Sequence, residues 1–440
     1  MWNRRDLLRA AGVGAAAAWL GCGRGDRLGP AAPAVDPDAL RAALRDAVAI
    51  AATRLREPVA YAQLRRRVRA VVDLVERDVG DELTTAIVIA GRDAAGRWRE
   101  RAVDRGEPAL IREAATRLIA DAPAGASAAV ALGAPEDRLA RPATDPAALE
   151  LEAWRDRVES LVRRADAGAT SRIIYRAVHV VTDDERTWVV TATRDRSERL
   201  VRTRLGATAI AWHGTGPVAG AAEVVGGFGP EPERLTDDAL AAVNAEALAL
   251  TTPGGFAPVA GAEVVLAPAI VAALVGPGGA RTRGLVAITH APDLEQAGVP
   301  GYASYQLDAL GGDGGPRRGG RFARLDARPS NLVVAPGATP GLADDVADGY
   351  LLDGVAHVGA TGDRVAIRIA RARRLAKGRR TGHAWRDVEL RGRLDDLLTG
   401  ARAVGADPIA IAGDDDGPPQ AIVAPSLLTR ADLGPARGTR

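Results

Sequence analysis

The stretch that decides the fold runs from Arg328 to Leu398 and alternates short apolar runs with glycine turns. Its three parts are RPSNLVVAPG (residues 328–337), GYLLDG (349–354) and GRRTGHAWRDVELRGRLDDLL (378–398). Short β-branched and apolar runs between Gly, Pro and Asp predict β-strands, and the closing RLDDLL predicts a helix. The same texture begins near residue 251, so we predict a turn-rich, mainly antiparallel β domain over residues 251–440.

The pattern before residue 251 is different. Apolar residues recur there at helical spacing in several segments, and a period of two begins at Val59. These features predict an α+β fold, in which an N-terminal helix and antiparallel-sheet domain over residues 36–250 precedes the β-rich domain. The predicted helices cover residues 36–56, 108–120, 146–165 and 236–250.

An acidic segment, TDDE at residues 182–185, separates two strands that we expect at Ser171–Val181 and Arg186–Asp195. Clustered Asp and Thr residues between β-rich runs are typical of turns. We therefore predict a solvent-exposed hairpin tip at this segment, in preference to a cation site.

The composition argues against nucleic-acid binding. The chain of 440 residues carries 58 cationic and 56 anionic side chains, interspersed throughout, and only 3% of its residues are aromatic. This balance provides neither a basic surface nor a platform for stacking bases. We predict no nucleic-acid partner.

The first residues have the features of an export signal. The segment NRRDLL (residues 3–8) matches the twin-arginine pattern, and an Ala/Gly-rich apolar run follows at residues 10–21. That run is too short to span a bilayer, which needs about 20 residues. We predict a twin-arginine signal peptide and linker over residues 1–35, with Arg4 and Arg5 as the signal residues.

The single cysteine, Cys22, directly follows Gly21 and is a candidate for lipidation. With no second cysteine, the chain can form neither an internal disulfide nor a cysteine-based zinc site. We expect export by the twin-arginine route to the periplasm or to a membrane-anchored place in the cell envelope. Contact with the membrane would then be made only through the signal or a lipid anchor. The alternative is a cytosolic protein with an amphipathic, arginine-rich first helix.

The chain resembles the TldD/PmbA family of metallopeptidases and their partner subunits. The resemblance is strongest from Arg328 to Asp407, good over PVAGAEVVLAPAIVAALV (residues 258–275) and weak before residue 200. It implies a TldD/PmbA-like fold and a role in proteolysis. In TldD-type members, the segment after the VVLAP-like strand carries an HExxxH motif, in which two histidines bind zinc and the glutamate activates the bound water.

The residues that would hold zinc are absent where this resemblance places them. The corresponding segment, AALVGPGGAR (residues 272–281), has no His or Glu, and Pro277 with its neighbouring glycines would end the helix. The family's third ligand is a cysteine, and the matching tail at residues 409–433 has none. The resemblance therefore implies the zinc-less TldE-like type. We predict no catalytic residue, no metal ligand and no cofactor in this chain, and expect zinc only in a catalytic partner.

The spacing of the histidines in the sequence does not indicate another zinc site. No two of them lie one helical turn apart, and none has an HExxH setting. We expect His179 to be a structural residue of an apolar strand and His290, before Ala-Pro, to lie in a loop. A site assembled in space from distant His and Asp residues stays open. The full set is His179, His213, His290, His357 and His383.

The predicted partners are a TldD-like subunit with HExxxH, or a second copy of this chain, together with an extended peptide substrate. An extended peptide can add a strand to a sheet edge. Arg186–Val190 and Leu332–Ala335 are candidate segments, either as edges or as core strands. Two alternatives remain beside the partner role. One is a stand-alone envelope protein that binds peptides or serves as structure, and the other is a peptidase with atypical metal ligands.

Overall fold

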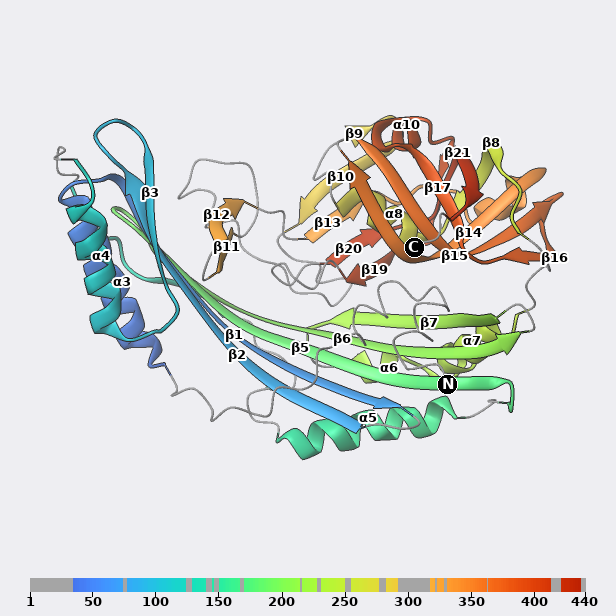
Figure 1. Cartoon of the computed structure of the whole chain (residues 1–440), viewed down its shortest axis with the longest axis horizontal. Helices are drawn as coiled ribbons and strands as arrows, with labels where there is room; N and C mark the ends of the chain where they lie inside the picture. Colours follow the sequence, from blue (N-terminus) through green and yellow to red (C-terminus); the bar gives the residue numbers. More distant parts are fainter. Residues whose placement is uncertain are drawn as a thin grey trace.

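The computed structural model (Figure 1) describes most of the chain. The predicted signal residues Arg4 and Arg5 and the lipidation candidate Cys22 lie outside the described residues. Those residues are 35–73, 77–123, 129–139, 145, 150–166, 170–213, 216–227, 231–249, 255–276, 282–291, 317–320, 323–327, 331–361, 363–412 and 421–436.

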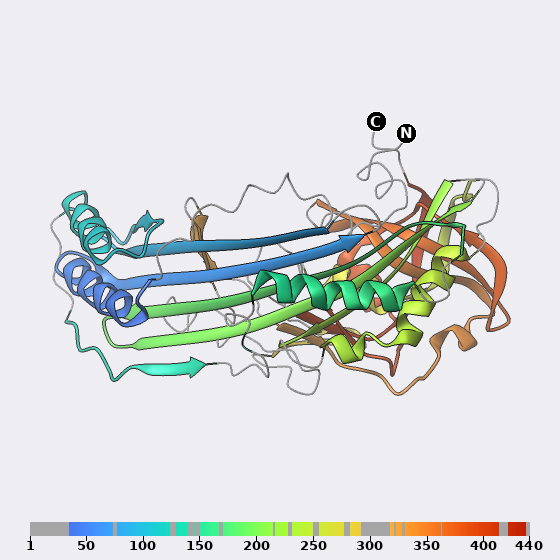
Figure 2. The same ribbon diagram turned by 90° about the horizontal axis from the view of Figure 1, so that it is seen from below.

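A curved sheet of long strands forms the first part of the structure (Figures 1 and 2). Its strand order is β3-β2-β1-β5-β6-β4, and β7 also pairs with β6. The pairs are antiparallel except β4–β6. The bounds are β1 Arg56–Asp73, β2 Arg77–Arg92, β3 Trp98–Val103, β4 Glu136–Leu139, β5 Ile173–Thr191, β6 Asp195–His213 and β7 Gly216–Gly226.

The turn predicted at residues 182–185 is wrong. Strand β5 runs without a break through this acidic segment, and the chain reverses only between Thr191 and Asp195. Asp183 lies opposite Arg67 of β1 in the strand register and is buried. An acidic segment is typical of a solvated turn only when no cation covers it, and here arginines of a strand distant in sequence do so.

Helices cover one face of this sheet. Asp36 and Thr236 cap two of them, since their side chains accept hydrogen bonds from the backbone N–H groups of Asp38 and Ala239. In Figure 2 these helices cross the side of the sheet that faces away from the C-terminal part. The bounds are α3 Pro37–Ala52, α4 Pro108–Ala120, α5 Leu151–Ala165, α6 Glu231–Arg234 and α7 Asp237–Leu248.

The alternation of side chains along β1 separates the two faces of the sheet. Ala60 and Ala62 pack with α3 and α4, and Val68 and Ala70 pack with α5 and α7. The opposite face, which we call the inner face, carries the odd-numbered residues of β1 and is directed toward the C-terminal part (Figure 1).

A close backbone approach fixes α7 on strand β7. A Cβ atom at Gly220 would overlap the carbonyl oxygen of Val243 in α7. Because only glycine leaves room there, the helix lies directly against the strand and buries Val243 and Ala247.

The C-terminal part combines a closed barrel with a second sheet. The barrel closes because β14 pairs with both β8 and β15 in the order β14-β8-β21-β17-β15, with β16 and β18 at its margin. The second sheet has the order β19-β20-β13-β10-β9. The barrel strands are β8 Val259–Leu266, β14 Asp348–Thr361, β15 Arg364–Ala376, β16 Arg379–Trp385, β17 Val388–Arg393, β18 Ala403–Val404 and β21 Leu427–Pro435.

The remaining elements of the C-terminal part are short. A small hairpin of β11 and β12 lies beside the N-terminal sheet in Figure 1. The bounds are α8 Pro268–Val275, η4 Leu342–Asp345, α10 Leu394–Thr399, β9 Thr282–Arg283, β10 Val286–Ala291, β11 Arg317–Gly320, β12 Ala323–Ala327, β13 Asn331–Val334, β19 Ile409–Ala412 and β20 Ala421–Ala424.

These elements confirm the predicted α+β fold with mainly antiparallel sheets. The parallel exceptions among the described strands are β4–β6, β8–β14 and β13–β20. Within the described ranges, no helix is long and apolar enough to cross a membrane.

The contact between β7 and α7 leads to a stability prediction. Replacing Gly220 with Ala should lower the free energy of unfolding by about 1–3 kcal/mol, because the added methyl group forces the helix away from the strand. Urea unfolding followed by circular dichroism measures the change. Gly382→Ala is the matched control, since a Cβ there meets no atom within 4 Å. Equal stability of the two variants would contradict the close approach.

Candidate functional site

The segment that the family resemblance assigns to zinc, residues 272–281, overlaps the end of a short apolar helix, and its residues 277–281 lie outside the described residues. Strand β8 leads through Ala267 into α8, which begins at Pro268 and ends at Val275, with Gly276 as its C-cap. Pro fits the first helical turn, where its missing N–H costs no hydrogen bond. The helix sequence, PAIVAALV, contains no side chain that can titrate or bind a metal.

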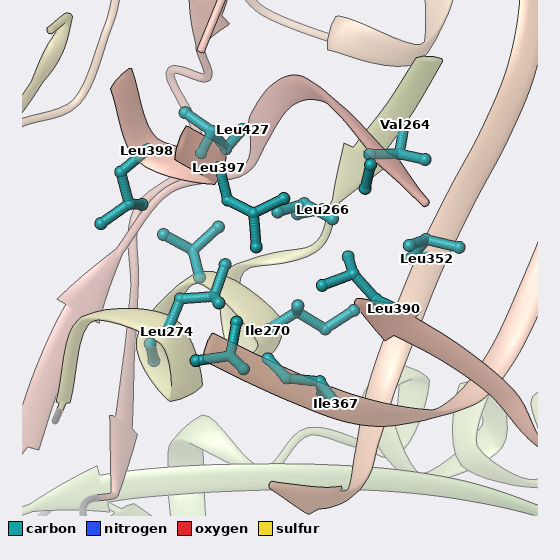
Figure 3. Packing of buried hydrophobic residues seen from close by; sticks show 14 of the residues in the cluster. Val264, Leu266, Ile270, Leu274, Leu352, Ile367, Leu390, Leu397, Leu398 and Leu427 are labelled. Atoms are coloured by element: carbon teal, nitrogen blue, oxygen red, sulfur yellow. The ribbon is translucent and has the colours of Figure 1, made fainter. Parts of the chain in front are cut away.

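Helix α8 is part of the largest hydrophobic core. Figure 3 shows Ile270 and Leu274 directed into a cluster of side chains from the barrel strands and α10. Both side chains are fully buried. The surrounding residues labelled in the figure are Val264, Leu266, Leu352, Ile367, Leu390, Leu397, Leu398 and Leu427.

This environment does not fit zinc. A catalytic zinc site needs three protein ligands of the His, Cys, Asp or Glu type and an open position for water. Helix α8 provides none of them, and its surroundings are aliphatic. Elsewhere among the described residues, no group of three or more His, Cys, Asp and Glu side chains is arranged to hold a metal ion.

The histidines lie on separate strands. His179 is in β5, His357 in β14 and His383 in β16, while His213 ends β6. The prediction that His290 lies in a loop is wrong. It is a residue of β10 and pairs with Leu332 of β13.

A buried ion cluster lies on the inner face of the N-terminal sheet. It consists of Arg65 and Arg67 of β1, Asp183 of β5, and Arg202 and Arg204 of β6. Asp183 Oδ1 lies 2.7 Å from Arg65 Nη2 and 2.7 Å from Arg67 Nε. The strand register places Arg67, Asp183 and Arg202 in one row across three neighbouring strands.

The charges in this cluster determine one another's protonation. Burial alone would raise the pKa of Asp183, but Arg65 and Arg67 outweigh it and hold that pKa below its usual value. The pKa of Arg204 is lowered to about 9, chiefly by burial and also by the nearby Arg67 and Arg65, against Glu223 and Asp183. Asp183 is therefore a fixed anion and is poorly suited to proton transfer at neutral pH.

His179 lies on the same inner face and is buried as a neutral ring. Burial lowers its pKa to about 4, and the charges of Arg204 and Arg69 act in the same direction. Its imidazole occupies the space over Gly206 of β6, where any Cβ would collide with the ring. The glycine in this strand is therefore explained by the histidine opposite it.

The ion cluster also joins the sheet to the C-terminal part. Arg202 Nη2 donates a hydrogen bond of 2.9 Å to the side-chain oxygen of Asn331 in β13. The same oxygen accepts the backbone N–H of Ala421 in β20 at 3.0 Å. One buried amide oxygen thus fixes β6 to two strands of the second sheet.

A second polar contact between the two parts involves a carboxyl group with an unusual pKa. Glu246 Oε1 of α7 lies 2.9 Å from Nη1 of Arg371 in β15, whose side chain is 4% exposed. Burial raises the pKa of Glu246 to about 7, against Arg371 and Arg373 and with support from Asp353 of β14. Perturbed carboxyl groups of this kind mark functional or structural junctions, and no sequence motif indicated this one.

Neither of the segments considered for peptide addition is a sheet edge. Residues 186–190 belong to β5, which lies between β1 and β6. Residues 332–334 belong to β13, which lies between β10 and β20. Both are core strands, so their backbone groups are already used in the sheets.

Three solved structures have a fold similar to this chain. TldE from Thermococcus kodakarensis has a TM-score of 0.63 at 13% identity, covering 90% of this chain and 100% of that protein. A protein of Thermotoga maritima, described as a candidate modulator of a DNA gyrase, has a TM-score of 0.62 at 16% identity, covering 86% and 96%. A similarly described protein of Bacteroides thetaiotaomicron has a TM-score of 0.62 at 13% identity, covering 90% and 98%.

These likenesses establish the fold over nearly the whole length of each of the three proteins. No protein-family model matches the sequence, and no curated protein matches it significantly. The fold is thus shared at an identity too low to transfer an activity.

We predict that removing the negative charge of Asp183 from the ion cluster strongly lowers the stability of the protein. Asp183→Asn should lower the free energy of unfolding by about 3–5 kcal/mol, because it removes a buried carboxylate that contacts two half-buried arginines. Chemical denaturation at pH 7 measures this change. Asp121→Asn is the control, because this exposed carboxylate lies 3.9 Å from Arg101 and should contribute less than about 0.5 kcal/mol. A small effect at Asp183 would mean that the cluster is not buried as described.

The carboxyl group of Glu246 predicts a pH dependence of stability. Folding raises its pKa from 4.5 to about 7, so its stabilising contribution is complete below pH 4.5 and is lost as the pH rises through 7. In Glu246→Gln the loss of stability between pH 4.5 and 7 that is due to this carboxyl group should disappear. Unfolding midpoints of both proteins between pH 4.5 and 7.5 test it, and parallel curves would show that the pKa of Glu246 is not raised.

Proposed function

We propose that this chain is a zinc-less, TldE-like subunit of the TldD/PmbA family, which works with a zinc-bearing TldD-like partner in a peptide-processing complex. The observation that carries the proposal is helix α8. Its last residues, 272–275, begin the segment that the family resemblance assigns to the zinc motif, and its side chains are apolar and mostly buried. The fold that it shares with TldE of Thermococcus kodakarensis supports the family.

In this role the chain supplies structure and binding surface, while its partner supplies the metal. Zinc in the partner would activate water for attack on a peptide bond. The residues described here offer no substitute for that chemistry, because Asp183 is a fixed anion and the neutral His179 lies buried over Gly206. The chain would therefore not hydrolyse peptides alone.

We further propose that the complex works in the cell envelope. The twin-arginine pattern at Arg4 and Arg5 and the apolar run before Cys22 support export. The twin-arginine route carries folded proteins, which suits a chain with no disulfide to form outside the cytosol. Lipidation at Cys22 would hold the complex at the membrane surface.

Co-purification tests the complex. A C-terminally tagged full-length chain is isolated from solubilised envelope of its native host, and the zinc content and peptide hydrolysis of the eluate are measured. We expect a second subunit with an HExxxH motif, about one zinc ion per complex and hydrolysis that a chelator abolishes. The chain expressed alone is the control, and it should hold no stoichiometric zinc and hydrolyse nothing.

Other results identify the alternatives. Stoichiometric zinc on the isolated chain would favour a peptidase with atypical ligands, and isolation without any partner would favour a stand-alone envelope protein. Mass spectrometry of the mature N-terminus tests the location. An intact Met1 on soluble cytosolic protein would exclude export, and an acyl group on Cys22 would establish the anchor.

A further inference from the structure

One rim of the N-terminal sheet has a stretch of backbone that pairs with no further strand among the described residues. Strand β3 pairs with β2 only from Ile87 to Arg92. From Val79 to Ala86, β2 pairs with β1 on one side and with no described strand on the other. Figure 2 shows β2 at the rim of the sheet, with the short β3 beside it only at the end near α4. The position next to β2 at this rim is thus occupied by β3 along only part of its length.

The side chains along this free stretch are accessible. Glu82, Leu83 and Thr84 are exposed, and Leu83, at 44%, is among the few large apolar residues with such exposure. Glu82 lies opposite Arg67 and therefore on the inner face, while Leu83 lies opposite Arg66 on the outer face. A strand added here would meet a carboxylate on one face and an apolar side chain on the other.

The charges at this edge favour a cationic occupant. Arg66 already pairs with Asp81, through Nη2 and Oδ2 at 2.7 Å. Glu82 makes no ion pair among the described residues, and its carboxylate accepts only a long hydrogen bond of 3.4 Å from Thr84. A second copy of this chain would bring its own Asp81 and Glu82 to the same edge, and like charges facing each other across strands are unfavourable. Charge thus favours an extended peptide over self-pairing.

We propose that the edge of β2 from Val79 to Ala86 binds an extended, proline-free peptide segment with a cationic residue beside Glu82 and an apolar residue beside Leu83. The peptide continues the strip that β3 begins, and its backbone groups pair with those of β2. Proline is excluded because it lacks the N–H that pairing requires. The inference rests on the proposed function, because it takes an extended peptide as the substrate, and it adds where the peptide binds and which side chains are selected.

Peptide binding to the purified full-length chain tests the site directly. The probe is a fluorescein-labelled peptide of about eight residues that alternates lysine and valine, titrated by fluorescence anisotropy at low salt. Glu82→Lys should weaken its binding about fivefold and strengthen binding of the matching glutamate–valine peptide by a similar factor. Glu113→Lys, at an exposed position of α4, is the charge-matched control and should change neither affinity.

Two further measurements locate the contact. Methylating alternate amide nitrogens of the lysine–valine peptide should abolish binding, because backbone pairing is then blocked. Hydrogen exchange should show new protection of the amides between Val79 and Ala86 when the unmodified peptide is present. If Glu82→Lys reverses the preference between the two peptides, misfolding cannot be the cause, because an unfolded variant would bind neither peptide.

Several results would overturn this inference while leaving the proposed function intact. One is equal binding of both peptides by Glu82→Lys, and another is protection confined to other strands. Dimerisation with protection of Val79–Ala86 in the absence of peptide would assign the edge to a second copy. Conversely, peptide binding at β2 without a co-purifying zinc subunit would refute the complex and leave this site standing.

Discussion

The ion pairs of Asp183 with Arg65 and Arg67 are the constraint on which the N-terminal sheet depends. They lie on central strands, so the register of β1 on β5 decides whether these charges meet or are buried without partners. A shift by one residue would move every side chain of the strand to the opposite face. The same register places Arg202 beside Asp183, where it also reaches Asn331. One row of charges thus aligns three strands and attaches the C-terminal part.

Local patterns predicted most of the individual elements. The helices capped by Asp36 and Thr236 begin where the sequence indicates, because capping depends on residues only a few positions apart. The error at residues 182–185 has the opposite origin. Nothing near Asp183 indicates that arginines more than a hundred positions earlier will cover it, so a buried ion pair has the same local sequence as a solvated turn. Glu246 escaped prediction for the same reason, since Arg371 and Asp353 come from distant strands.

At helix α8 the chain shares the fold of similar proteins without the side chains that bind a metal. Helix α8 overlaps the segment to which the resemblance assigns a zinc motif, but its sequence is suited to packing, with aliphatic side chains around it. Building a metal site there would require several ligands at once in a buried core, where unpaired polar groups are costly. The shared fold therefore assigns no activity to this chain by itself.

The closure of the barrel has a consequence for the order of folding. Strand β8 pairs with β21, and the backbone N–H of Gly261 binds the side chain of Asp432, 171 residues later. The C-terminal part therefore cannot complete its core until almost the whole chain has been synthesised. Arg65 must likewise wait for Asp183, 118 residues further on. Such distant pairings make folding slow and mainly post-translational, so the nascent chain must stay protected from aggregation for longer than a protein of local contacts.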